Sequence, residues 1–178
     1  MTSICFHGAE STGKTVLIRQ LADEYSCPWV PEYGRTYAEE RGTDFSMDDL
    51  LAIARGQDEA MREAAKHKPA LLLLDTDPLM TAAWAQMLFG EIPDELLSYP
   101  KADHYLLFEP DVPWKDDGTR MFGADDARHR FATIAEDMLV RTKVPFTRIS
   151  GGWREREMQA RDAIAAHIAG AGEDRVDV

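Results

Sequence analysis

The sequence predicts an α/β protein in which a parallel β-sheet is covered by helices on both faces. Short apolar runs alternate with helical patterns about five times along the 178 residues, which is the pattern of strands joined by helical crossovers. Several of these runs are continuous rather than alternating, as expected for strands buried on both faces. No linker or change in composition divides the chain, so we expect one domain over residues 1–169 and a flexible tail over residues 170–178.

Composition and charge narrow the class of function. The formal net charge of −12 opposes broad binding to nucleic acid or to an anionic membrane surface. No apolar run approaches a membrane span, and the first residues lack a secretory signal. Cys5 and Cys27 lack metal-type spacing, and the five histidines show neither metal spacing nor paired partners. We therefore expect a cytoplasmic protein that acts on a small molecule, with no nucleic acid and no membrane, and we leave a homo-oligomer open.

A phosphate-binding motif joins the first predicted strand to the first predicted helix. The apolar residues 4–7 enter the loop Gly8-Ala9-Glu10-Ser11-Thr12-Gly13-Lys14-Thr15, which opens into an amphipathic helix at about residues 14–25. The two glycines allow successive N–H groups to turn toward a phosphate, and the helix N-terminus adds a favourable dipole. Lys14 is expected to reach the β and γ phosphates of ATP, and Thr15 to bind Mg²⁺. A chance match in a glycine-containing turn is opposed by the flanking strand and helix. The predicted nucleotide-binding residues are Gly8, Glu10, Ser11, Thr12, Gly13, Lys14, Thr15 and Val16.

Local signals define the elements that follow. Prolines confine the extended residues 28–31 to the end or edge of the sheet, and a short helix is predicted over residues 36–41. Ser46 and Asp49 form a capping-box pattern for a long helix that ends near Lys66. The continuous apolar run of residues 70–74 then predicts a strand buried on both faces.

The second half continues the alternation. Asp77 and Pro78 predict the start of a helix that Gly90 ends. The stretch of residues 109–126 carries prolines, glycines and acidic residues with few aliphatics, so we expect an exposed loop or lid. The other predicted elements are a short helix over 93–99, a strand over 105–108, a helix around 131–139, a strand over 146–149 and a last helix over 153–169.

Two carboxylates follow the buried strand of residues 70–74. In doubly wound sheets ligands collect at the carboxyl ends of strands. Asp75 has the position of the carboxylate that holds Mg²⁺ in P-loop enzymes, and a strand-end turn residue is the alternative. Asp77 is expected to cap the next helix, either alone or while also contacting the substrate.

Charged and aromatic residues after the second strand and in the lid supply the predicted chemistry. Glu32 is the predicted general base, because a kinase acting on an alcohol needs a carboxylate to accept the hydroxyl proton. A surface glutamate is the alternative. Arg35 is expected to bind a phosphate or a substrate carbonyl, with a surface ion pair as the alternative. Arg120 is predicted to close onto the transferring phosphoryl group, and Trp114 either faces the ligand or packs under its loop.

These motifs together resemble one family. Residues 8–15, Pro31-Glu32-Tyr33-Gly34-Arg35, Asp75-Thr76-Asp77 and Pro113-Trp114 with Asp117, Gly118 and Arg120 are similar to the ribosylnicotinamide kinase domain of the bacterial NAD-biosynthesis regulator. The resemblance covers about residues 4–169. It implies a P-loop kinase fold with a five-stranded parallel sheet, and the ATP-dependent, Mg²⁺-requiring phosphorylation of the 5′-hydroxyl of nicotinamide riboside. The roles of the DNA-binding and adenylyltransferase domains that multifunctional members carry upstream are not carried over.

A cationic acceptor makes a further demand on the site. The pyridinium ring of nicotinamide riboside has a fixed positive charge, which aromatic faces and carboxylates would favour. Tyr33, Asp77, Trp114 and Asp116 are the residues that the sequence offers for this purpose. A kinase of another nucleoside or small alcohol, and an ATP-binding regulator with slow hydrolysis, remain as alternatives. A general base at Glu32 favours the kinases, since a regulator needs none.

Overall fold

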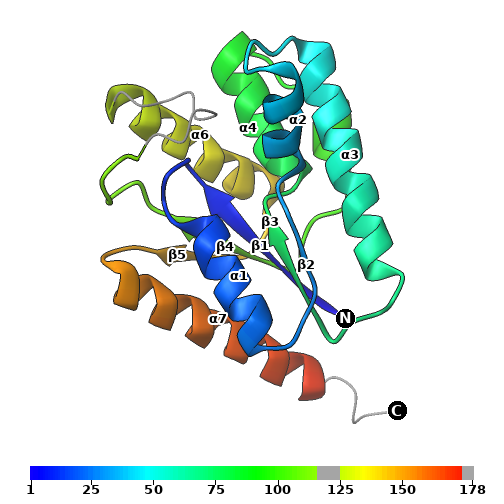
Figure 1. Ribbon diagram of the computed structural model, residues 1–178, viewed down its shortest axis with the longest axis vertical. Helices are drawn as coiled ribbons and strands as arrows, with labels where there is room; N and C mark the ends of the chain where they lie inside the picture. Colours follow the sequence, from blue (N-terminus) through cyan, green and yellow to red (C-terminus); the bar gives the residue numbers. More distant parts are fainter. Residues whose placement is uncertain (116–124, 174–178) are drawn as a thin grey trace.

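The protein is built around a five-stranded parallel sheet with the strand order β2-β3-β1-β4-β5 (Figure 1). The computed structural model describes residues 1–115 and 125–173, with side chains described as far as residue 169. The predicted α/β class with five parallel strands is confirmed. The strands are β1 (Thr2–Gly8), β2 (Trp29–Val30), β3 (Leu71–Asp75), β4 (His104–Phe108) and β5 (Phe146–Ile149).

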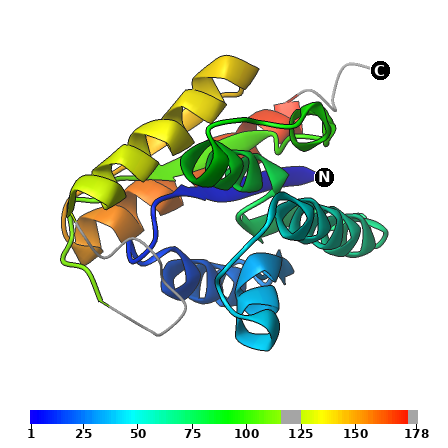
Figure 2. The same ribbon diagram turned by 90° about the horizontal axis from the view of Figure 1, so that it is seen from above.

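Helices cover both faces of this sheet. One face is covered by α1 and α7, and the other by α3, α4 and α6, which gives three layers (Figure 2). The two-residue strand β2 lies at the edge, as its flanking prolines predict. The helices are α1 (Lys14–Glu24), α2 (Tyr33–Arg41), α3 (Met47–Ala65), α4 (Pro78–Phe89), α5 (Asp94–Ser98), α6 (Asp125–Thr142) and α7 (Trp153–Glu173).

The continuous apolar runs are explained by the two buried faces of each central strand. In β3, Leu72 and Leu74 belong to the core that α3, α4 and α6 cover, whereas Leu71 and Leu73 belong to the core that α1 and α7 cover. Successive side chains of a strand point to opposite faces, so a strand that is covered on both faces favours apolar residues at consecutive positions. The same division separates Leu107 from Leu106 in β4.

Most predicted element boundaries are close to those observed. Ser46 and Asp49 form the expected capping box of α3, in which the Ser46 amide donates to Asp49 Oδ2 at 2.8 Å. Gly90 ends α4 in the left-handed conformation. The largest differences concern three helices. Helix α2 begins at Tyr33 rather than near residue 36, α6 begins at Asp125 inside the predicted lid, and α7 continues to Glu173.

The prediction that the histidines lack paired partners was wrong. The rings of His104 and His167 lie with their centroids 3.9 Å apart, because the first residue of β4 meets the later turns of α7. Sequence spacing cannot reveal a pair that only the tertiary fold brings together. Within the described part of the chain, no helix has both the length and the apolar character that crossing a membrane requires.

Candidate active site

The phosphate loop begins at the carboxyl end of the central strand β1. Gly8 has a φ of 122°, and a Cβ at this position would lie 2.5 Å from the carbonyl oxygen of Phe108 in β4. Only glycine satisfies both constraints. Gly13, with a φ of 89°, turns the loop into α1. All eight residues predicted to bind the nucleotide line one cavity of about 260 Å³, which we call the phosphate cavity.

Lys14 is buried at the start of α1, with only 9% of its surface exposed. Its Nζ donates hydrogen bonds to the carbonyl oxygens of Gly8 at 2.9 Å and Ala9 at 2.7 Å. The ammonium group is therefore held inside the loop by its own backbone. Together with the N-terminus of α1, it makes this cavity favourable for an anion.

Thr15 and Asp75 form a polar pair beside the loop. The Thr15 hydroxyl donates a hydrogen bond of 2.7 Å to Asp75 Oδ2, and Asp75 is 1% exposed. Burial raises the pKa of Asp75, although the Thr15 hydrogen bond and the charge of Lys14 oppose this shift. Asp75 Oδ1 has no hydrogen-bond partner among the described residues. A buried carboxylate oxygen with spare capacity, next to a hydroxyl, fits the hard oxygen ligands that Mg²⁺ prefers.

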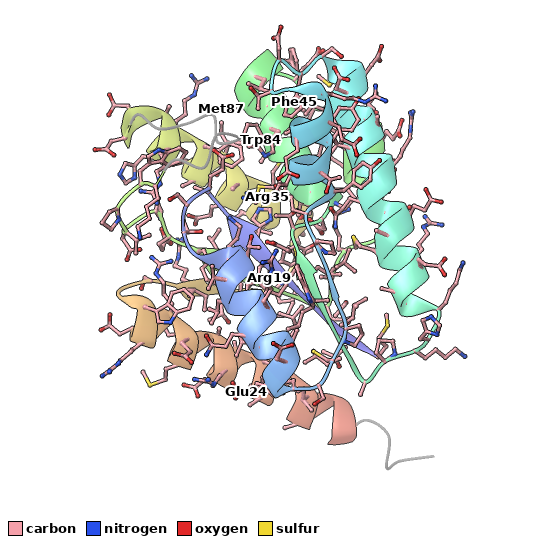
Figure 3. The ribbon with its side chains drawn as sticks, viewed as in Figure 1. Arg19, Glu24, Arg35, Phe45, Trp84 and Met87 are labelled. Carbon is pink, nitrogen blue, oxygen red and sulfur yellow. The ribbon has the colours of Figure 1, made fainter. Side chains whose placement is uncertain are left out.

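A second cavity, which we call the acceptor cavity, lies between α2, α3 and α4. Apolar side chains such as Phe45, Ile53 and Met80 form much of its wall, with Gln57 and Thr81 as polar members. It shares a wall with the phosphate cavity, and Figure 3 shows Arg35 and Trp84 of this wall near Phe45. The shared residues are Glu10, Glu32, Arg35, Thr76, Met80 and Trp84. A group bound in one cavity can thus meet a group bound in the other.

Glu32 lies in the shared wall as the N-cap residue of α2. Its side chain makes no capping hydrogen bond and is half-buried. Burial raises its pKa to about 7, and the negative charge of Asp75 adds to the shift while Lys14 and Arg35 oppose it. A carboxyl group that titrates near neutral pH is suited to accept a proton during a reaction. The position and the pKa both agree with the predicted role of Glu32.

Asp75 and Asp77 point in different directions because Thr76 between them has a φ of 74°. Asp77 is 1% exposed and lines neither cavity. Its carboxylate accepts hydrogen bonds from the Leu79 amide at 3.0 Å and from the Tyr105 hydroxyl at 2.5 Å. Asp77 therefore caps α4 as predicted, and its contact with a substrate stays a prediction.

Tyr33 and Trp114 also lie away from the two cavities. The ring of Tyr33 packs on α3 so closely that a Cβ at Gly56 would lie 2.4 Å from it. The half-buried Trp114 lies beneath the guanidinium of Arg128, 5.9 Å from its ring centroid, which favours packing under the loop. Neither residue lines the two described cavities, and the contact of Tyr33 and Trp114 with an acceptor stays a prediction. Arg120 and Asp116 lie outside the described residues.

Sequence reasoning missed two buried arginines that hold the phosphate loop. Arg128 of α6 donates to the carbonyl oxygens of Ser11 at 3.2 Å and Val112 at 2.6 Å. Arg156 of α7 is 1% exposed and donates to the carbonyl oxygens of Thr12 at 3.4 Å and Glu109 at 3.0 Å. Both arginines occupy the apolar stripe of their helix. A cation in such a stripe needs acceptors, and this signal could have identified them.

Trp84 and Phe45 were missed for a different reason. The place of Trp84 among apolar residues at helical spacing suggests a core residue, but Trp84 is half-buried and lines both cavities. Helix α4 is apolar on all sides, so periodicity cannot show which of its residues faces a ligand. Phe45 lies between two helices, where no periodic pattern exists.

Comparisons with known proteins agree with this geometry. A family model described as AAA domain matches residues 3–156. The trifunctional NAD biosynthesis/regulator protein NadR of Escherichia coli (strain K12) is 29% identical over 154 residues, which are 83% of this chain and 38% of that protein. A solved structure of NadR protein in complex with NR has a TM-score of 0.80 and 25% identity over 94% of this chain and 52% of its own. NadR in complex with NAD and AMP-PNP has a TM-score of 0.71 and 21% identity over 94% of this chain and 49% of its own. The resemblance predicted from the motifs is thereby confirmed, and the chain spans less than half the length of the curated relative.

Proposed function

The chain belongs to the AAA domain family, and from this premise we propose that it is an ATP-dependent kinase that phosphorylates the 5′-hydroxyl of nicotinamide riboside to give nicotinamide mononucleotide. The observation that carries the proposal is the wall shared by the phosphate and acceptor cavities, with Glu32 in it. The similarity to NadR in complex with NR supports this acceptor. The similarity to NadR in complex with AMP-PNP supports ATP as the donor.

The phosphate loop binds the triphosphate in this proposal. Its backbone amides and the N-terminus of α1 face the phosphates, and the Lys14 ammonium exchanges its two carbonyl partners for phosphate oxygens. The Thr15 hydroxyl and the Asp75 carboxylate would hold Mg²⁺, which neutralises charge on the phosphates. Arg128 and Arg156 keep the loop in position through their hydrogen bonds to the carbonyl oxygens of Ser11 and Thr12.

Glu32 acts as the general base. Its carboxylate accepts the proton of the 5′-hydroxyl as that oxygen attacks the γ phosphorus, and the β–γ bridging oxygen leaves with ADP. Arg35, in the same wall, binds the phosphoryl oxygens as charge shifts during transfer. We retain Arg120 as a second arginine for that group and Asp116 as an acceptor ligand; both lie outside the described residues.

The acceptor cavity is lined by aromatic faces and carboxylates, which would favour a pyridinium ring. The residues that supply them were not predicted for this purpose from the sequence. Phe45 and Trp84 supply aromatic faces, and Glu10 and Glu32 supply carboxylates. Cation–π and partly desolvated charge contacts are each worth about 1–2 kcal/mol, so together they can favour the cation roughly a hundredfold over a neutral nucleoside.

The test is a comparison of acceptors at equal ATP and Mg²⁺. We expect kcat/KM for nicotinamide riboside to exceed the values for uridine and adenosine by roughly a hundredfold. Nicotinic acid riboside, whose carboxylate cancels the net charge, should rank between them. Mass spectrometry of the product identifies nicotinamide mononucleotide. A neutral nucleoside as the best acceptor would make the protein another nucleoside kinase, and no stimulation of ATP consumption by any acceptor would favour the regulator.

A further inference from the structure

The backbone on both sides of Glu32 is held by one buried side chain of α3. The amide of Tyr33 donates a hydrogen bond of 2.7 Å to Gln57 Oε1, and Gln57 Nε2 donates one of 3.3 Å to the carbonyl oxygen of Pro31. Gln57 is 2% exposed, and both ends of its amide are thus used by the residues that flank Glu32.

We infer that Gln57 is a positioning residue that fixes the Glu32 carboxylate in the wall between the two cavities. The inference deepens the proposed function and rests on it for the chemical role of Glu32. The Glu32 side chain makes no capping bond of its own, so its place depends on the backbone that carries it. That backbone follows a two-residue edge strand, which offers little other support.

A neighbouring glycine supports the same conclusion. Gly56 lies in the middle of α3, where glycine is unfavourable compared with alanine. A Cβ there would lie 2.4 Å from the Tyr33 ring, so the absent side chain is what lets residues 31–33 dock on the helix. Gly56 and Gln57 together bind the turn that carries Glu32, the first by leaving space for the Tyr33 ring and the second by two hydrogen bonds.

The decisive experiment is a double-mutant cycle between Gln57 and Glu32. Gln57→Leu removes both hydrogen bonds, and we expect kcat to fall by roughly tenfold or more while KM for ATP stays within about twofold. In a Glu32→Gln background, the same Gln57→Leu change should cause no further loss of kcat, because its effect passes through Glu32. If Gln57→Leu lowers kcat by the same factor in the Glu32→Gln background as in the wild type, the inference is overturned.

The chain offers a matched control at Gln159. This residue holds Ser150 with the same two bonds, accepting from the Ser150 amide at 2.9 Å and donating to its carbonyl oxygen at 3.3 Å. Gln159→Leu should lower the melting temperature to a similar extent as Gln57→Leu but leave kcat within about twofold at saturating ATP. An equal fall of kcat in both variants would mean that Gln57 has only a structural role.

A readout without turnover separates this inference from the proposed function. We expect the crystal structure of Gln57→Leu to show the Glu32 carboxylate displaced from the shared wall, compared with its position in the wild type. The Tyr33 amide should also exchange its hydrogen faster in the variant than in the wild type. An unmoved carboxylate would overturn the inference even if the kinase is active. A displaced carboxylate in a protein that phosphorylates no acceptor would uphold it and reject the kinase. Should Gln57→Leu fail to fold, Gln57→Glu keeps the Tyr33 bond, loses the Pro31 bond and is expected to show an intermediate displacement.

Discussion

Thr15 and Asp75 lie 60 residues apart and are joined by a hydrogen bond of 2.7 Å between the threonine hydroxyl and a carboxylate oxygen. The bond exists because β1 and β3 are neighbours, so their carboxyl ends meet at one edge of the sheet. It links the phosphate loop to the carboxylate that ends the neighbouring strand β3.

Asp75→Asn should weaken the use of Mg²⁺. The amide oxygen can still accept from Thr15, but the negative charge that favours a divalent cation is lost. We expect the free Mg²⁺ needed for half-maximal activity to rise about tenfold or more, while Mg²⁺-free nucleotide binding measured by calorimetry changes little. Asp77→Asn is the matched control, because Asp77 faces the core and should affect stability alone. Equal shifts in both variants would reject a metal role for Asp75.

Glu32→Gln should lower kcat by roughly 10² to 10⁴, with KM for ATP little changed. In the wild type, kcat/KM should rise with pH through about 7, because burial raises the pKa of Glu32 and only its deprotonated form is a base. The variant should lose this rise. A loss of less than about fivefold would make Glu32 a positional residue, and Glu10 in the same wall would be tested next.

Lys14→Met should remove nearly all phosphoryl transfer, a fall of about 10³ or more in kcat. Methionine keeps the buried stem of the side chain but loses the charge that faces the phosphates. Circular dichroism should show a folded variant, since the two bonds lost are to loop carbonyls. Turnover close to that of the wild type would remove the P-loop from the mechanism.

Phe45→Leu should narrow the preference for the cationic acceptor. Phe45 lines the acceptor cavity but not the phosphate cavity, so KM for nicotinamide riboside should rise roughly five- to tenfold while KM for ATP stays constant. KM for uridine should change less. Trp114→Ala is the comparison. If Trp114→Ala reduces the preference for nicotinamide riboside over uridine more than Phe45→Leu does, Trp114 and not Phe45 faces the ligand.

His7→Gln should make stability less dependent on pH. Burial, opposed by the hydrogen bond with the Ala135 carbonyl, lowers the pKa of His7 from 6.5 to about 3. The unfolded state therefore binds more protons between these values, and stability is lost as pH falls below about 6.5. From pH 7 to pH 5 the wild type should lose about 2 kcal/mol through His7, as measured by urea unfolding. If the free energy of unfolding of His7→Gln falls between pH 7 and pH 5 by as much as that of the wild type, other groups are responsible for the pH dependence.

The phosphate loop and the strands were predictable because each depends on residues close together in the sequence. Gly8, Gly13, Lys14 and Thr15 meet requirements that the loop itself imposes, and the run of leucines in β3 reflects two buried faces. Tertiary contacts decide the rest. The choice between Asp75 and Asp77 depends on the positive φ of Thr76, which the residue type does not reveal.

The acceptor side was harder to predict for a related reason. Tyr33 follows a strand in a motif that suggests ligand contact, but a glycine in α3 gives its ring another place to lie. Trp84 belongs to a helix that is apolar all round, so its exposure to two cavities leaves no periodic signal. In both cases the residues that decide where the ring lies are distant from it in the sequence.

The central place of β1 in the sheet also bears on how the chain acquires its fold during synthesis. This strand is made before both of its neighbours, because its partners are β3, beginning at Leu71, and β4, ending at Phe108. Parallel neighbours cannot form a local hairpin, so the two edges of an emerging β1 stay unpaired until first β3 and then β4 have been translated. The backbone of Gly8 packs against Phe108, the last residue of β4, so this contact of the phosphate loop forms only after that residue leaves the ribosome.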